Sequence, residues 1–283
     1  MIWKKGAAVN NRKETNCIQK VTKCIFCIDE WCRRVYNQNM FNTQHILYMV
    51  ISGAATVALL LLARRLAKTE REKNRILKFF AIITVVIHYS NLWVDYFASG
   101  GTATVENNQI LPVYPCNVVM WMLLIAALMK NKKSLAFQML GEFCFYGGTV
   151  CGIVGIVLNA NFGNTPTLAD YDILKGMLSH STMLFGCLYM MTGRFIRIRV
   201  FNAVSVAAGL GTFVLCGMAV NQLYEHFGMT PPDGMFLKSN PYISVSPIVL
   251  GIVVVALLFC GLAIRELRLP KEERWYTKGK LRH

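Results

Sequence analysis

Long uninterrupted apolar stretches restrict the fold of this chain more than any other feature. They run for roughly 17 to 25 residues, the length that a helix needs to cross the hydrocarbon of a bilayer, and the charged residues lie between them. Only 16% of the residues are charged, against about 25% in soluble domains, which excludes a water-soluble protein. Backbone amides in lipid must be hydrogen-bonded, and a helix does this within its own segment. The sequence lacks the alternation of polar and apolar residues that is typical of the strands of a membrane barrel. We therefore predict an all-α fold, a polytopic membrane helix bundle.

Seven transmembrane helices are predicted, and the basic residues between them set an orientation. The predicted spans are 46–62, 79–97, 111–129, 135–158, 173–192, 200–224 and 242–264. Twenty of the thirty Lys and Arg lie on alternate connections, at 64–78, 130–133, 194–199 and from 265 onward. The opposite connections hold only Lys238. Because basic segments are retained in the cytoplasm, we expect the carboxyl terminus inside and the amino terminus outside.

The chain is expected to consist of a basic amphipathic tail at 1–40, a membrane domain at 41–266 and a basic cytoplasmic tail at 267–283. The first tail carries eight Lys or Arg, which would resist translocation, and its apolar residues recur at helical spacing, as in a helix lying in the headgroup plane. An alternative is that translation begins at Met40 and the tail is dispensable. The net charge of +15 thus indicates topology rather than a nucleic-acid partner.

Cysteines and glycines favour packing over metal or cofactor binding. Four of the ten cysteines form a cluster at 17, 24, 27 and 32, but that segment lacks the Gly or Pro turns that would close a zinc site, so palmitoylation or apolar packing is favoured and no metal is predicted. Gly148 and Gly152 form a G-x-x-x-G pair, for which helix packing is the favoured role. No nucleotide or dinucleotide motif is present, and no cofactor is predicted.

Polar residues within spans are costly and are the first functional candidates. In this chain they are His88, Asp95, Tyr114, Cys116, Asn117, Glu142, His180, Asn221 and Tyr224. A rise of about 1.5 Å per residue from each outer boundary places five of them in the outer half of the membrane, where they could share an outward-facing pocket. These five are Asp95, Cys116, His180, Asn221 and Tyr224, while Glu142 lies deeper and is expected to be neutral or paired.

Cys116 and His180 together suffice for acyl transfer. A thiolate is a strong nucleophile, a histidine within reach can take the thiol proton, and Asp95 or Asn221 could orient the imidazole. Each residue also has a structural interpretation: Cys116 as an apolar filler, His180 as an interhelical hydrogen-bonding group and Asp95 as the partner of His88, seven residues earlier on the same helix face.

The chain resembles the YwaF-like family of integral membrane proteins, which includes the animal transmembrane protein 164 family. The resemblance covers 41–250 and rests on Phe41-Asn42-Thr43-Gln44-His45, Leu111-Pro112 followed by Cys116, Ser179-His180-Ser181, Asn221 and Asn240-Pro241-Tyr242. It implies a phospholipid acyltransferase that moves a fatty acyl chain through a thioester on Cys116, with His180 as its histidine. The expected partners are membrane lipids, with a phospholipid or lysophospholipid as substrate, in a bacterial cell membrane. Many relatives carry His where this chain has Tyr114, which puts the details of proton transfer in doubt.

Two other functions fit the same residues. In a transporter or channel, His88, Asp95, Glu142 and His180 would relay protons or ions. In a non-catalytic scaffold, the polar residues would only fasten helices together. Seven spans do not divide into two equal repeats, which weakens the transporter interpretation.

Overall fold

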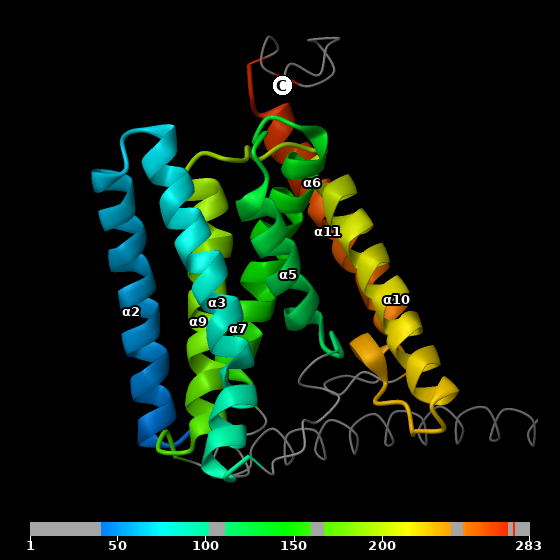
Figure 1. The fold of residues 1–283 in the computed structure, drawn as a ribbon. Coiled ribbons are helices and arrows are strands. Elements are labelled where there is room, and N and C mark those ends of the chain that lie inside the picture. The colour runs from blue at the N-terminus through cyan, green and yellow to red at the C-terminus, as the bar shows by residue number, and fades with distance from the viewer. Residues whose placement is uncertain (1–40, 102–110, 160–166, 239–245, 271–273, 275–283) are drawn as a thin grey trace, which may run out of the picture.

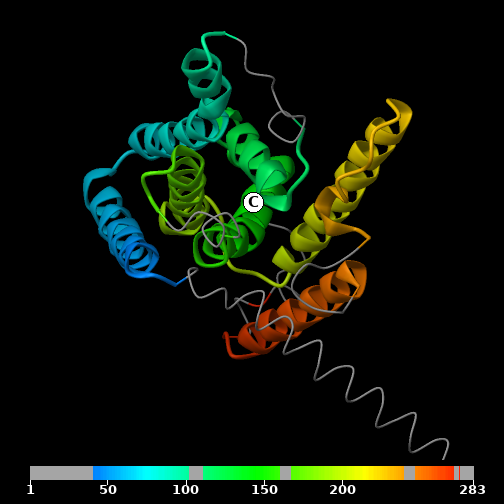
Figure 2. The same cartoon turned by 90° about the horizontal axis from the view of Figure 1, so that it is seen from below.

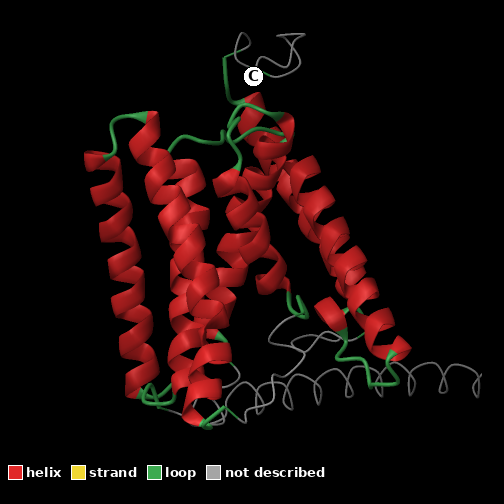
Figure 3. Cartoon of the chain, in the orientation of Figure 1, coloured by secondary structure: helices red, strands yellow, loops and turns green. Residues whose placement is uncertain are grey.

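The computed structural model describes residues 41–101, 111–159, 167–238, 246–270 and 274. Some predictions lie outside these residues. They concern the tail at 1–40, the motif Asn240-Pro241-Tyr242 and most of the tail at 267–283, of which 271–273 and 275–283 are not described. Within them the secondary structure is helical and contains no strand (Figure 3). The elements are α2 (Thr43–Leu66), α3 (Glu70–Ala98), α5 (Pro115–Leu128), α6 (Leu135–Phe143), the π-helical turn η1 (Cys144–Gly148), α7 (Thr149–Val157), α9 (Tyr171–Thr192), α10 (Asn202–His226), the 3-10 turn η2 (Gly234–Phe236) and α11 (Pro247–Leu267).

Each predicted span corresponds to one helical rod in the described part of the chain, with α6, η1 and α7 forming a single rod. Five rods are long and apolar enough to cross a membrane: α2, α3, α6 to α7, α10 and α11. The other two are α5 and α9. With 14 residues, α5 is only about 21 Å long, shorter than the roughly 30 Å of hydrocarbon, because residues 111–114 before it are not helical. Pro112 and Pro115 explain this start, since the residue before a proline disfavours helix.

Local sequence sets where the helices begin. The Asn42 side chain accepts a hydrogen bond from the backbone N–H of His45, 2.9 Å away, and so caps α2. Thr69 and Glu72 form a reciprocal capping box at the start of α3. Pro115 and Pro247 occupy the first turns of α5 and α11, where no N–H donor is needed. Capping side chains and prolines at the edges of the apolar stretches therefore define where these helices begin.

Helix α9 lies at the centre of the larger part of the bundle. It contacts α2, α3, α5 and α7, which surround it in the view along the helices (Figure 2). Helices α10 and α11 contact each other and lie to one side (Figures 1 and 2). The basic connections at 67–69, 129–134 and 193–201 all lie at the same end of the bundle as the end of α11, the upper end in Figure 1.

The rod at 135–157 changes partners at its π turn. Before the turn, Phe143 packs against Gly209 of α10, where an added Cβ would lie 2.0 Å from the phenyl ring. From the turn onward, the rod packs closely on α9: a Cβ on Gly148, the last residue of η1, would lie 2.3 Å from the Cys187 sulfur, and one on Gly152 of α7 would lie 2.9 Å from Leu184. The predicted packing role of these two glycines is confirmed.

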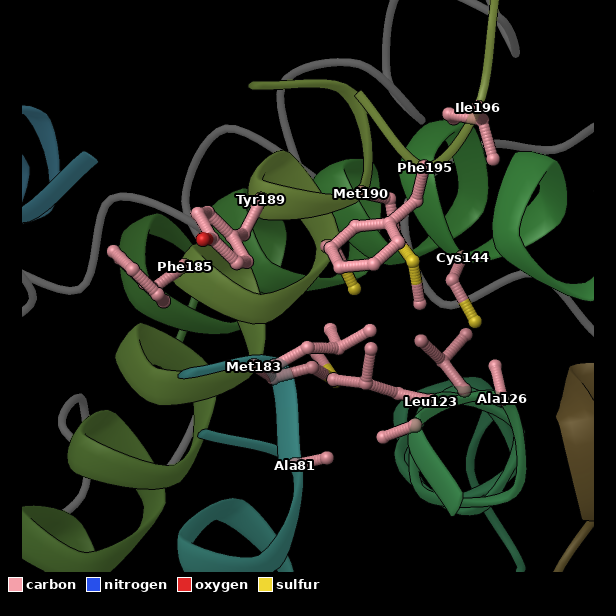
Figure 4. Packing of buried hydrophobic residues seen from close by; sticks show 14 of the residues in the cluster. Ala81, Leu123, Ala126, Cys144, Met183, Phe185, Tyr189, Met190, Phe195 and Ile196 are labelled. Atoms are coloured by element: carbon pink, nitrogen blue, oxygen red, sulfur yellow. The ribbon is translucent and has the colours of Figure 1, made fainter. Parts of the chain in front are cut away.

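The main hydrophobic core lies between α5, α9 and the π turn. Figure 4 shows Leu123, Cys144, Met183 and Tyr189 within this cluster, and all are nearly or fully buried. Because the core lies around α9 and not around α11, the packing that holds side chains in fixed positions is concentrated there.

Candidate functional site

A small cavity joins α3, α5 and α9. It is lined by Thr84, His88, Cys116, Met120, Ser179, His180 and Met183. Its volume of about 10 Å³ leaves room for about one water molecule. The structure thus brings together three of the residues predicted from the sequence, namely Cys116, His180 and His88.

Cys116 is the second residue of α5. Its Sγ donates a hydrogen bond to the Oδ1 of Asn117, 3.3 Å away. Asn117 is itself buried, and its Nδ2 donates to the carbonyl oxygen of Leu111 at 3.5 Å. The first amides of a helix have no acceptor within the helix, so the start of α5 presents N–H groups and the positive end of the helix dipole to the sulfur. These N–H groups are therefore available to a negatively charged group bound beside Cys116.

His180 is held in one tautomer by its own helix. Its Nδ1 lies 2.7 Å from the carbonyl oxygen of Gly176, one turn earlier. A carbonyl oxygen only accepts hydrogen bonds, so Nδ1 carries the proton and Nε2 of the neutral ring has a free lone pair. The ring packs against Gly155 of α7, where a Cβ would lie 2.0 Å from Cδ2 and 2.3 Å from Nε2. Gly155 therefore provides the space that the imidazole occupies.

The remaining polar residues of the cavity were not selected as candidates from the sequence. Thr84 is buried, and its hydroxyl donates to the Phe80 carbonyl at 2.7 Å and contacts the Thr182 hydroxyl at 3.0 Å. Ser179 donates to the Gly176 carbonyl at 2.8 Å. Thr84 could have been predicted from its position four residues before His88, because this spacing places both side chains on one face of α3.

Three predicted residues fasten the entry of α5 instead. Asn221 Oδ1 accepts a hydrogen bond from the Gly234 amide at 2.8 Å, and Tyr224 packs with Val113. The Tyr114 ring lies 5.6 Å from that of Phe236. These contacts join α5 to α10 and η2, and none of the three residues lines the cavity.

Asp95 and Glu142 also lie outside the cavity. Asp95 is a partly exposed residue in the last turn of α3. Glu142 is buried between α6 and α10, where it accepts a hydrogen bond from the Ser205 hydroxyl at 2.5 Å. Glu142 therefore has a hydrogen-bonding partner within the bundle. The four groups that a proton relay would use do not meet in one place.

Two motif residues near the chain entrance have structural roles. The buried His45 hydrogen-bonds through Nε2 to the carbonyl oxygen of Ile156 at 2.7 Å, near the end of α7. Gln44 accepts from the Leu168 amide at 2.9 Å. His45 therefore joins α2 to α7, and Gln44 joins α2 to the segment just before α9. Across the described ranges, no group of three His, Cys, Asp or Glu side chains could hold a metal ion.

Comparison with known proteins assigns the family. No curated protein and no solved structure matches the chain. The family model of the TMEM164 family matches residues 40–265, which include all the helices described above except the last two residues of α11. Together with five apolar helices of membrane-crossing length, this match indicates a multi-pass integral membrane protein. The chain belongs to the TMEM164 family.

Proposed function

We propose that this protein is a phospholipid acyltransferase or transacylase in which Cys116 carries the acyl group as a thioester. His180 acts as the general base and then as the general acid. The observation that carries this proposal is the shared cavity, which a thiol from α5 and an imidazole from α9 both line. The sequence alone indicates on which face of its helix each of the two residues lies. That these faces line one cavity depends on how α5 and α9 pack.

In the first half-reaction, Nε2 of His180 takes the proton from Cys116 Sγ, and the thiolate adds to the ester carbonyl carbon of a donor phospholipid. The tetrahedral intermediate collapses with cleavage of the ester C–O bond. The leaving glycerol oxygen takes the proton from His180 and departs as the hydroxyl of a lysophospholipid. Cys116 is left as an acyl thioester.

In the second half-reaction, His180 takes the proton from the hydroxyl of an acceptor lysophospholipid, whose oxygen attacks the thioester. The C–S bond breaks, and His180 returns its proton to the sulfur. The Gly176 carbonyl, which accepts from Nδ1, keeps the ring oriented and stabilises the imidazolium formed in each half. The amides at the start of α5 stabilise the negative oxygen of each tetrahedral intermediate.

The small volume of the cavity requires that substrate entry displace side chains. Met120 and Met183 both line it. Methionine side chains are unbranched and flexible, so they can move at a small cost in free energy and admit an acyl chain from the surrounding lipid.

The test is acyl transfer from a labelled phospholipid to a lysophospholipid by purified protein in lipid nanodiscs. We expect Cys116→Ala to reduce the rate to background and His180→Ala to reduce it by at least about 10²-fold, the usual contribution of a general base. The double variant should lose little more, because both residues serve the same steps. Cys144→Ala is the matched control, since Cys144 is a buried thiol that does not line the cavity. Full activity of Cys116→Ala would overturn the proposal.

A further inference from the structure

A second, larger cavity lies at the carboxyl-terminal end of α9, between α2, α3 and the segment that follows α9. Its volume is about 280 Å³, near the lower end of small-ligand sites. It is lined by Ala63, Arg64, Ala67, Lys68, Lys73, Tyr189, Thr192, Gly193 and Arg194. His180 and Tyr189 are nine residues apart on α9, so the two cavities are separated by about 14 Å along that helix.

The charges around this cavity are unbalanced. Lys73 is paired with Glu70, at 2.7 Å between Nζ and Oε1. Among the residues that the structure describes, the side chains of Arg64, Lys68 and Arg194 form no ion pair. The other nearby carboxylate, Glu72, is engaged by the backbone amides of Lys68 and Thr69 at 2.9 and 2.8 Å. Three positive charges therefore line the cavity without an anionic partner.

Tyr189 supplies a further donor. The residue is 1% exposed and lines the cavity. Figure 4 shows its hydroxyl oxygen directed away from Leu123 and Cys144. A buried phenol that faces a basic cavity is suited to donate a hydrogen bond to an anion held there.

Arg194 occupies a position that normally favours glycine. The amide of Arg194 bonds to the Met191 carbonyl and that of Phe195 to the Met190 carbonyl, as in a Schellman motif, and Arg194 has φ +65°. An arginine in this left-handed conformation is less favourable than glycine. The basic residues at this end are also explained by the orientation of the protein in the membrane. Orientation does not explain why they line a cavity, or why an arginine occupies a position that favours glycine.

We propose that this cavity binds the phosphate of an anionic phospholipid headgroup. Guanidinium groups match phosphate oxygens geometrically, and basic pockets between membrane helices at the interface suit such headgroups. A lipid is favoured over free phosphate because Val57 and Leu61 of α2, each 57% exposed and seven and three residues before Arg64 on the same face of the helix, provide an apolar surface for the acyl chains. The site is independent of acyl transfer at Cys116.

The test is native mass spectrometry of the full chain with phosphatidylglycerol, with phosphatidylcholine of the same acyl chains, and with inorganic phosphate. We expect one phosphatidylglycerol to bind in preference to phosphatidylcholine. Arg64→Gln and Arg194→Gln should each weaken its affinity about ten-fold, the effect of losing a charge-assisted hydrogen bond. Arg65→Gln is the control, because it removes the same charge from the same turn of α2 but does not line the cavity; we expect a change of no more than about two-fold.

Arg194→Gly separates binding from folding. It should fold with a thermal midpoint at least as high as the parent chain, because glycine suits the left-handed position, and yet lose affinity like Arg194→Gln. An equal loss of affinity in Arg65→Gln would overturn the proposal in favour of general surface attraction. Equal binding of phosphatidylcholine, or complete competition by inorganic phosphate at the lipid concentration, would overturn the lipid assignment.

Discussion

Helices α9 and α11 are similar in length but differ in what surrounds them. Ten of the 22 residues of α9 are buried, against two of the 21 residues of α11. Helix α11 has an unbroken apolar sequence up to Arg265, whereas α9 carries Ser179, His180, Ser181 and Thr182 in its middle. A helix that faces lipid must be apolar, because nothing there can satisfy polar side chains. A helix surrounded by other helices can carry polar groups, because its neighbours and its own carbonyls accept their hydrogen bonds.

A pair of glycines gives the largest expected difference between these regions. Gly155→Ala on α7 would put a methyl group into the His180 ring, whereas Gly261→Ala on α11 meets no described atom within 4 Å. We expect Gly155→Ala to displace the imidazole and lower acyl transfer by about 10²-fold, the effect of a misplacement near 1 Å. Gly261→Ala should leave the rate unchanged and stabilise α11 slightly, since alanine favours helix.

The measurement is the transfer rate in nanodiscs together with a thermal unfolding curve for each variant. Similar rates for the two variants would show that the position of His180 does not depend on its contact with α7.

A pair of leucines compares packing in the same two regions. Leu123 of α5 is fully buried, and Leu257 of α11 is 68% exposed. Leu123→Ala should leave a cavity in the core and lower the free energy of unfolding by about 2–4 kcal/mol. Leu257→Ala should cost less than about 0.5 kcal/mol, because lipid chains fill the vacated space. Unfolding in detergent with increasing denaturant measures both, and equal losses would contradict the location of the main core between α5 and α9.

The sequence predicts the helical rods well and their arrangement poorly. Hydropathy locates α2, α10 and α11, because these helices expose apolar side chains, and Pro112 and Pro115 indicate the irregular entry of α5. The change of partners at the π turn is not encoded in any local pattern, since it depends on which helices lie beside Cys144 and Gly148. Depth in the membrane predicts that Asn221 and Tyr224 share a pocket with Cys116. In the structure these two side chains lie on the face of α10 that packs against η2 and the segment before α5.

The last prediction concerns the pH dependence of stability at the end of α5. Lys132, after α5, donates to the carbonyl oxygens of Ala126 and Ala127 at 2.6 and 2.9 Å. Burial lowers the pKa of the Lys132 ammonium to about 8, and the nearby charge of Lys78 adds to this. Lysine in the unfolded chain has a pKa of 10.5, so the unfolded state binds more protons between these values, and stability should rise as the pH increases from 8 to 10.5.

Thermal midpoints measured across this range for the parent chain, Lys132→Met and Lys133→Met check this prediction. The rise should disappear only in Lys132→Met. A rise of the same size in that variant would assign the pH dependence to other groups.

The central claim, that Cys116 at the start of α5 carries the acyl group, is tested most directly by intact mass. Purified protein is incubated with a donor phospholipid that has one defined acyl chain, without an acceptor, and is quenched in acid. We expect an added mass of one acyl group that hydroxylamine removes, that maps to Cys116 by peptide analysis, that persists in Cys144→Ala and that is absent from Cys116→Ala. Acylation of Cys116→Ala to the same extent, or a label that maps to another residue, would contradict the account.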